Sequence, residues 1–108
     1  MLVEVLKSKL HKATVTGADL HYEGSISIDP KLYRKAGMYT YEKADIFNVN
    51  TGARFSTYII EGKPGEICLN GAAARLVAVG DKVIIVSYTQ VDSEQVESWK
   101  PTVVLLGT

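Results

Sequence analysis

The chain contains 108 residues, and its 12 Lys and Arg residues are balanced by 12 Asp and Glu residues, so its formal net charge at pH 7 is zero. This length predicts a single domain covering residues 1–108, and the lack of a basic excess argues against nucleic acid and anionic membranes as partners. The longest apolar runs, such as residues 83–86, are strand-sized, and the N-terminus lacks a signal-peptide core, so we expect a cytoplasmic protein.

The chain opens with a predicted strand that carries basic side chains on one face. Residues 2–6 are mostly apolar, and Lys7, Lys9 and His11 follow at a spacing of two. Because alternate residues of a strand point to the same side, these three side chains are expected to share a face. An anion-binding face and an ordinary solvated strand face both fit this pattern.

Six further short strands are predicted between turn-forming residues. They cover residues 26–28, 44–49, 54–60, 67–69, 82–88 and 102–106. The strand at 26–28 alternates and is expected to be half-buried, whereas the continuous apolar middle of 82–88 is typical of a central strand buried on both faces. Residues 50–52 contain residues that tolerate positive φ, so the strands on either side of them are expected to form a hairpin.

The predicted helices are short. Asp29-Pro30 is typical of an N-cap and a first helical residue, with Gly37 ending that helix. Asp92 and Gln95 fit a capping box for a helix that continues through Trp99, and residues 72–74 predict one helical turn. Short strands with brief helices favour a mainly β fold and a closed β-barrel.

The segment Tyr22-Glu23-Gly24-Ser25 contains a Gly-Ser bond suited to self-cleavage. Ser25 Oγ can attack the carbonyl carbon of Gly24, because glycine has no Cβ to block the approach. An ester then replaces the amide, and elimination breaks the Oγ–Cβ bond to leave dehydroalanine. Addition of water and loss of ammonia give a pyruvoyl group at a new N-terminus. The alternative reading is a turn, which is the commoner use of a Gly-Ser pair.

Four segments, in this order and at matching spacing, carry a resemblance to a known family. They are Lys9-Leu10-His11, Ala18-Asp19-Leu20-His21-Tyr22-Glu23-Gly24-Ser25, Arg54-Phe55-Ser56-Thr57-Tyr58 and Asn70-Gly71-Ala72-Ala73-Ala74. From the N-terminus to about Val104 the chain resembles the aspartate 1-decarboxylases, pyruvoyl-dependent enzymes of the pantothenate (coenzyme A) pathway that convert L-aspartate into β-alanine and CO2. The resemblance implies a six-stranded double-psi β-barrel that cleaves itself into residues 1–24 and 25–108.

The resemblance also implies roles for individual residues. Ser25 would become the pyruvoyl group, which forms a Schiff base with the substrate amine and accepts electrons as pyridoxal phosphate (PLP) would, so that neither PLP nor a metal is needed. Arg54, Lys9 and His11 would bind the two carboxylates of L-aspartate, and Tyr58 would donate a proton to the intermediate. For each of the cations, a surface ion pair is the alternative.

Thr57 would assist cleavage by donating a hydrogen bond to the oxygen of Gly24. Neighbouring residues of a regular strand face opposite sides, so we expect an end, bend or bulge at Thr57 and Tyr58 that lets both reach one site. Tyr22 would line the pocket. Oxygen atoms of the substrate or the pyruvoyl group would be bound by the segment Asn70, Gly71, Ala72 and Ala73, although Asn-Gly is more commonly a turn.

The resemblance implies a homotetramer with active sites at subunit interfaces, and a chain of this length gains from such an interface. Cys68, the single cysteine, excludes an internal disulfide and most metal-site spacings, and we expect it to be buried in the core. Two other functions stay open. One is a non-enzymatic small barrel that binds an anion or a partner through its cations, and the other is a domain whose self-cleavage is its whole function.

Overall fold

The computed structural model describes residues 1–107 as a mainly β protein with short helices, which confirms the predicted fold class. The strands within this range are β1 (Leu2–Thr14), β2 (Gly17–Asp19), β3 (Ser25–Ile28), β4 (Lys43–Asn48), β5 (Arg54–Glu61), β6 (Ile67–Asn70), β7 (Lys82–Asp92) and β8 (Thr102–Leu105). The helices are α1 (Pro30–Lys35) and the 3₁₀ helices η1 (Gly71–Leu76) and η2 (Ser93–Ser98). Each strand predicted from the sequence is present.

The strands follow one another in the order β2-β6-β3-β5-β4-β7-β1-β8, each hydrogen-bonded to its neighbours. β4 and β5 form the predicted antiparallel hairpin. β3 pairs with β5 in parallel and with β6 antiparallel, and β1 lies between β7 and β8. Closure of this sheet into a six-stranded double-psi barrel stays a prediction.

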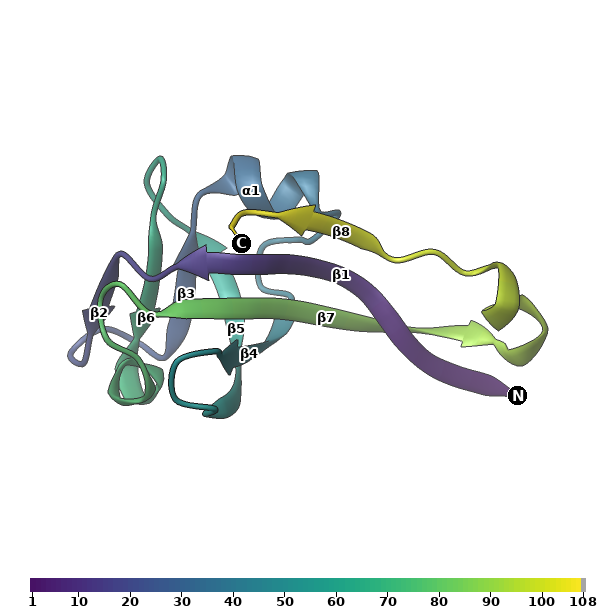
Figure 1. Cartoon of the computed structure of the whole chain (residues 1–108), viewed down its shortest axis with the longest axis horizontal. Coiled ribbons are helices and arrows are strands. Elements are labelled where there is room, and N and C mark those ends of the chain that lie inside the picture. Colours follow the sequence, from purple (N-terminus) through teal and green to yellow (C-terminus); the bar gives the residue numbers. More distant parts are fainter. Residues whose placement is uncertain (108) are drawn as a thin grey trace.

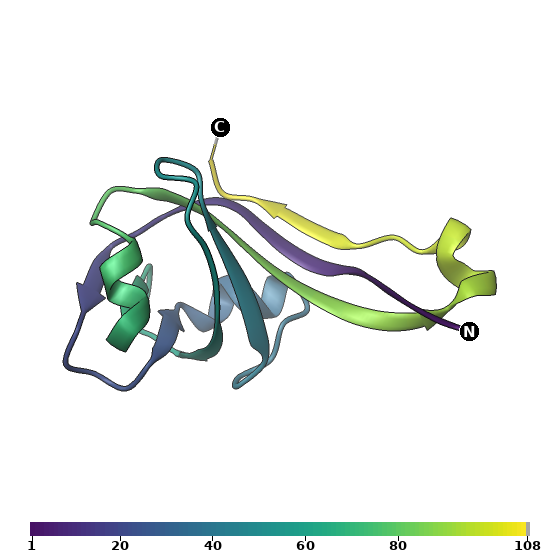
Figure 2. The same cartoon turned by 90° about the horizontal axis from the view of Figure 1, so that it is seen from below.

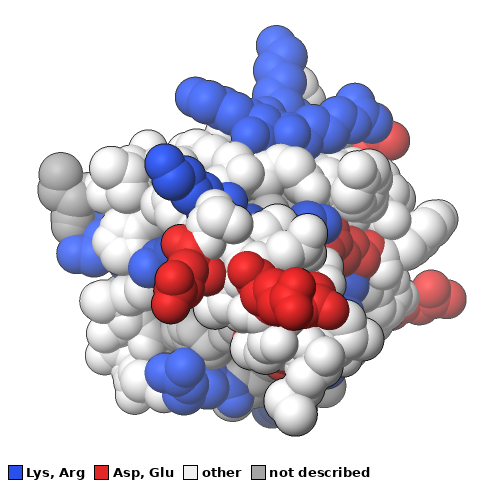
Figure 3. All heavy atoms as spheres, turned by 90° about the vertical axis from the view of Figure 1, so that its right-hand side faces the viewer, with Lys and Arg blue, Asp and Glu red and all other residues white. Residues whose placement is uncertain are grey.

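Long strands β1 and β7 form a ribbon that extends beyond the rest of the molecule (Figures 1 and 2). The chain measures 44 × 25 × 24 Å along its principal axes, and η2 lies with the N-terminus at the far end of the ribbon. Seen from that end, acidic and basic side chains both occur on the face, so neither sign of charge dominates it (Figure 3).

The core contains inward-facing apolar side chains of the short strands and of the long strands β1 and β7. The fully buried members include Leu10, Ile26, Ile28, Ile46, Ile59, Leu69 and Ile85. The middle of β7 is buried as predicted, with Val83 and Val86 in the interior. The expectation that residues 26–28 form a half-buried strand is wrong, because β3 lies between β5 and β6 and Ser27 is buried as well.

The first predicted helix begins and ends where the sequence indicates. The Asp29 carboxylate accepts a hydrogen bond from the backbone N–H of Lys31 at 2.9 Å, and Pro30 is the first helical residue. Gly37 follows the helix with φ +76°, a conformation that glycine adopts without strain. No helix within residues 1–107 combines the length and the apolar character that crossing a bilayer requires.

Candidate active site

Ser25, the predicted nucleophile, is the first residue of β3 and is 1% exposed. Pairing with β6 places it directly opposite Asn70. The Ser25 hydroxyl donates to the carbonyl oxygen of Glu23 at 2.9 Å, and Ser25 Oγ accepts a hydrogen bond from Asn70 Nδ2 at 3.0 Å. Two hydrogen bonds therefore fix the position of the nucleophilic oxygen.

A cavity of about 350 Å³ opens beside Ser25. Its lining residues are Tyr22, Glu23, Ser25, Thr40, Tyr41, Tyr58, Ile60 and Glu61. Tyr58 comes from β5, the parallel neighbour of β3, and its side chain is 37% exposed. The fold thus brings the predicted nucleophile, the predicted proton donor and Tyr22 to a single cavity.

Thr57 does not line this cavity. β5 continues through Thr57 and Tyr58, which pair with Ala44 and Lys43 of β4 without a register shift. The predicted end or bulge at this point is therefore wrong for the described residues. In a regular strand the two side chains face opposite sides, because successive Cβ atoms alternate.

Arg54 begins β5 and lines a different cavity, of about 320 Å³, together with Phe47 and Tyr88. Its guanidinium carbon lies 3.8 Å from the centroid of the Phe47 ring, a cation–π contact. Arg54 and Tyr58 lie on the same face of β5 because they are four residues apart, which corresponds to about 13 Å along an extended strand. Within one chain, Arg54 therefore belongs to a separate part of this face.

Lys9 and His11 lie on β1, which is separated from β5 by β4 and β7 in the strand order. Lys9 is opposite Val86 of β7, which is opposite Asp45 of β4. His11 Nδ1 is buried and has no hydrogen-bond partner among the described residues. The alternation of the buried residues Ser8 and Leu10 with Lys9 and His11 supports a common face for these two basic residues, whereas the register of β1 against β7 shifts at Lys7.

Lys7, the remaining basic residue of the predicted face, is already paired. Its ammonium group donates to both carboxylate oxygens of Glu42, at 2.9 and 2.7 Å, and lies 4.9 Å from the centroid of the Tyr39 ring. An anion would have to compete with this carboxylate, so Lys7 contributes little to an anion-binding face.

The end of β6 and the start of η1 lie next to the predicted cleavage bond. Asn70 ends β6 and is 3% exposed, and Gly71 begins η1 against the backbone of Gly24. Ala72 and Ala73 follow in η1, where Ala72 is exposed and Ala73 is half-buried. The predicted helical turn at residues 72–74 is thus confirmed.

Cys68 is half-buried, so the expectation that it is a buried core residue is wrong. It lines a cavity of about 570 Å³, because its neighbour across the strand pair is Gly17, which has no side chain to cover the thiol. The pKa of the thiol is raised by partial burial, and secondarily by the negative charges of Glu66 and Asp19. The thiol is therefore protonated at neutral pH.

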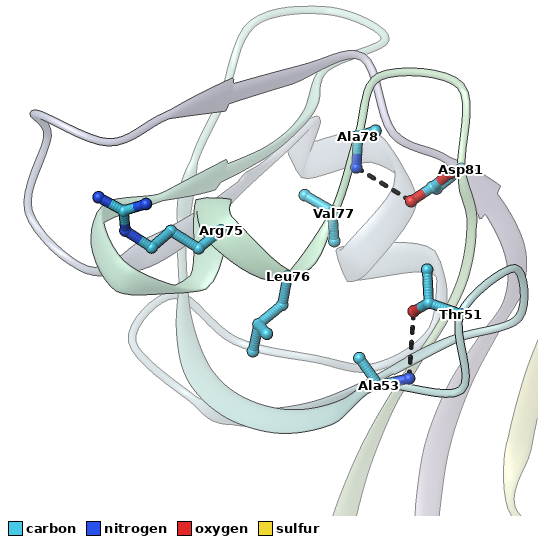
Figure 4. A pocket seen from close by; sticks show the side chains of 7 residues that line it. All are labelled: Thr51, Ala53, Arg75, Leu76, Val77, Ala78 and Asp81. Atoms are coloured by element: carbon cyan, nitrogen blue, oxygen red, sulfur yellow. Dashed lines mark hydrogen bonds between the residues drawn. The ribbon is translucent and has the colours of Figure 1, made fainter.

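Another cavity, of about 360 Å³, lies next to η1 and contains none of the predicted site residues (Figure 4). Its polar groups already serve the surrounding loops, since Asp81 accepts from the Ala78 backbone N–H and Thr51 Oγ1 accepts from that of Ala53. The Arg75 guanidinium points away from the other lining side chains. This arrangement offers no group for chemistry.

Sequence reasoning missed Ser27, which accepts a hydrogen bond from Asn70 Nδ2 at 2.9 Å. Its spacing of two from Ser25 was the available signal, because residues i and i+2 of a strand share a face. Tyr41 was also missed, and it reaches the cavity from a loop position with φ +69° that no sequence pattern indicated. Within residues 1–107, no group of three or more His, Cys, Asp or Glu side chains is placed to hold a metal ion.

Comparison of the sequence with known proteins shows the family of this chain. The family model described as aspartate decarboxylase matches residues 1–108. The chain is 58% identical over 104 residues to an aspartate 1-decarboxylase of Campylobacter hominis, covering 96% of this chain and 91% of that protein. It is 62% identical over 104 residues to an aspartate 1-decarboxylase of Syntrophus aciditrophicus, covering 94% and 90%, respectively. With a sequence match of this extent and a buried, fixed serine after Gly24, the chain belongs to the aspartate decarboxylase family.

Proposed function

We propose that this protein is a cytoplasmic enzyme of the pantothenate pathway that converts L-aspartate into β-alanine and CO2, using a pyruvoyl group made from its own Ser25. The observation that carries the proposal is the buried Ser25 Oγ, held by Asn70 beside a cavity that also contains Tyr58. The two relatives described above are both named aspartate 1-decarboxylase, which supports the choice of substrate.

In the proposed maturation, Ser25 Oγ attacks the carbonyl carbon of Gly24, the peptide C–N bond breaks, and the Ser25 nitrogen becomes an amine. Loss of the Ser25 Cα proton and cleavage of the Oγ–Cβ bond release the Gly24 carboxylate and leave dehydroalanine. Addition of one water and loss of one ammonia complete the change. The side of Gly24 on which a Cβ would stand is open, since no atom outside its two chain neighbours lies within 4 Å of that position, and this leaves room for the attack.

The residues around position 25 fit a pyruvoyl group. Asn70 Nδ2 supplies a buried N–H donor to that position, and the adjacent cavity leaves room for a small substrate. When present, the pyruvoyl carbonyl supplies an electron sink for the decarboxylation. Tyr58 and Tyr22 both line this cavity, where Tyr58 would return a proton to the substrate.

We propose that the active enzyme is a homotetramer in which neighbouring subunits share each active site. One chain holds Ser25 and Tyr58 at one cavity, while Arg54 lines another cavity about 13 Å away along β5. Lys9 and His11 belong to β1, separated from β5 by β4 and β7. Carboxylate-binding cations from one subunit can therefore complete the cavity of another.

The two alternative functions are less well supported. A binding module would use the basic residues of β1 to bind an anion, but one of them, Lys7, is already paired with Glu42. A domain that only cleaves itself has no need for Tyr58 beside the cleaved bond. Neither alternative explains the match to enzymes named for decarboxylation.

The test compares wild-type protein with Ser25→Ala after warm incubation, using denaturing gels, intact mass spectrometry and an assay for β-alanine. Wild type should yield fragments 1–24 and 25–108 whose summed mass equals that of the intact chain plus one water minus one ammonia. Ser25→Ala should stay whole and inactive, and Ser25→Cys should cleave slowly through a thioester. A wild-type chain that stays whole and yet forms β-alanine would overturn the proposal.

A further inference from the structure

The side-chain amide of Asn70 uses all its principal hydrogen-bonding capacity inside the protein. Its two N–H groups point to Ser25 Oγ, at 3.0 Å, and Ser27 Oγ, at 2.9 Å. Its oxygen accepts from the thiol of Cys68, whose Sγ lies 3.4 Å from Asn70 Oδ1. Asn70 and both serines are at least nine-tenths buried, whereas Cys68 is half-buried.

The other partners of Ser25 determine which end of the amide faces it. The Ser25 hydroxyl proton is already donated to the carbonyl oxygen of Glu23, so Ser25 Oγ is available to Asn70 as an acceptor. An amide turned by 180° would place Oδ1 against the lone pairs of this oxygen and Nδ2 against the thiol, a weak acceptor. The orientation with Nδ2 toward Ser25 is therefore favoured from both ends.

We propose that Ser27 and Cys68 are positioning residues for self-cleavage, which hold the Asn70 amide from opposite sides so that its N–H points to the nucleophilic oxygen of Ser25. This inference rests on the proposed function, since it concerns the maturation step. Neither residue touches the bond that breaks, and both act through Asn70.

An N–H donor at this oxygen favours two stages of the reaction. It stabilises negative charge on Oγ as the hydroxyl proton leaves and Oγ attacks the Gly24 carbon. The same oxygen departs from Cβ in the elimination and becomes part of the Gly24 carboxylate, so the donor stabilises the leaving group as well. Both effects require the N–H direction to be fixed before the reaction begins.

The surroundings of Cys68 suit a fixed thiol donor. The raised pKa of the thiol keeps the S–H proton in place at neutral pH. Gly17 gives the sulfur its space, because a Cβ at position 17 would lie 3.1 Å from Sγ. The carbonyl oxygen of Leu69 is the competing acceptor at 3.9 Å, which is farther than Asn70 Oδ1.

The experiment measures how fast freshly purified full-length precursor is converted to fragments, by intact mass spectrometry over time. Ser27→Ala and Cys68→Ala should each cleave about three- to tenfold more slowly than wild type, as expected for the loss of one hydrogen bond. Ser27→Thr, which keeps the hydroxyl, and Cys68→Ser, which replaces the thiol by another donor, should cleave within about twofold of wild type. Ser98→Ala, in η2 at the far end of the ribbon, is the matched control and should cleave at the wild-type rate.

A second comparison separates positioning from packing. In an Asn70→Ala background, Ser27→Ala and Cys68→Ala should cause no further slowing, because the amide on which they act is absent. Cys68→Val repeats the measurement with an apolar side chain that still fills the site, and thermal unfolding verifies that each variant is folded. Equal slowing in both backgrounds, or wild-type rates for the single variants, would overturn this inference while leaving self-cleavage intact. Wild-type protein that never cleaves would instead refute the proposed function, and the positioning role with it.

Discussion

Gly71 lies so close to Gly24 that the two backbones are in contact across the start of η1. A Cβ added to Gly71 would lie 2.7 Å from Gly24 Cα and 2.8 Å from its nitrogen, and the residue has φ +66°. Neither atom belongs to a flexible side chain, so the clash could be relieved only by moving the backbone. Glycine at position 71 therefore fixes the approach of η1 to the bond that is proposed to break.

Gly71→Ala is expected to stop or strongly slow self-cleavage and to reduce the free energy of unfolding by about 2 to 4 kcal/mol. Gly65→Ala is the matched control, because Gly65 also has positive φ, +76°, but a Cβ there would meet no atom within 4 Å. For Gly65→Ala, the free energy of unfolding should fall by only about 1 kcal/mol, and self-cleavage should proceed at the wild-type rate. Chemical denaturation and intact mass spectrometry measure both effects. Normal cleavage by Gly71→Ala would show that this contact does not position Gly24.

Arg54→Ala should leave self-cleavage unchanged while lowering decarboxylation. Its guanidinium contacts the Phe47 ring and lies in a cavity separate from that of Ser25, so it has no part in the attack on Gly24. Loss of a charged contact to a substrate carboxylate costs about 2 to 3 kcal/mol, or roughly 30-fold to 160-fold in kcat/KM. Arg54→Lys keeps the charge without the planar guanidinium group, so its kcat/KM should lie between those of wild type and Arg54→Ala. Undiminished kcat/KM in Arg54→Ala would remove Arg54 from the substrate site.

Thr57→Val should slow self-cleavage by about a hundredfold, since the variant keeps the size of Thr57 but cannot donate to the Gly24 oxygen as negative charge develops. Thr57→Ser keeps the hydroxyl and should cleave at close to the wild-type rate. Intact masses followed over time provide the rates. Equal rates for the Val and Ser variants would show that the donor is another group, in line with the position of Thr57 outside the Ser25 cavity.

The pH dependence of stability should include a contribution from Asp29. The pKa of its carboxyl is lowered from 3.8 by a hydrogen bond from the Gly65 backbone N–H, and next by one from Lys31. Because the pKa is lower in the folded state, this contribution is fully present above about pH 3.8 and is lost as pH falls through the folded value. Asp29→Asn should therefore unfold with a flatter acid dependence than wild type in thermal scans. An identical acid dependence would contradict this role.

Light scattering should find a tetramer in active wild-type protein. Mixing the weakly active variants Arg54→Ala and Tyr58→Phe should raise the activity above that of either variant alone after subunit exchange, because a shared site can draw Arg54 from one subunit and Tyr58 from the other. Activity in a monomeric fraction, or mixtures without any recovery, would contradict shared active sites.

Local patterns were sufficient for most strands and for α1, where Asp29, Pro30 and Gly37 each have one dominant conformational use. β2 was missed because Gly17–Asp19 has little strand propensity of its own and is extended through its pairing with β6. The irregularity expected at Thr57 was inferred from its proposed role and not from the local sequence. It is absent because β5 pairs with β4 through Thr57 and Tyr58 without interruption.

The candidate site was predicted only in part, for a similar reason. Ser25, Tyr58 and Tyr22 come together because β3 and β5 are parallel neighbours, a pairing that no local pattern specifies. The bonds of Asn70 to Ser25 and Ser27 depend on the register of β3 against β6. Such register depends on the whole sheet, so these contacts could not be derived from residues taken a few at a time.

The position of β1 between β7 and β8 determines what cleavage would do to the protein as a whole. Fragment 1–24 would keep all of β1 and β2, and its backbone hydrogen bonds to three other strands do not depend on the broken peptide bond. The product would thus be a heterodimer of a short and a long chain that gel filtration cannot tell from the precursor. Before cleavage, each subunit would refold as a single chain, a step that does not depend on protein concentration. After cleavage the two chains would have to associate, so recovery of the fold would depend on protein concentration.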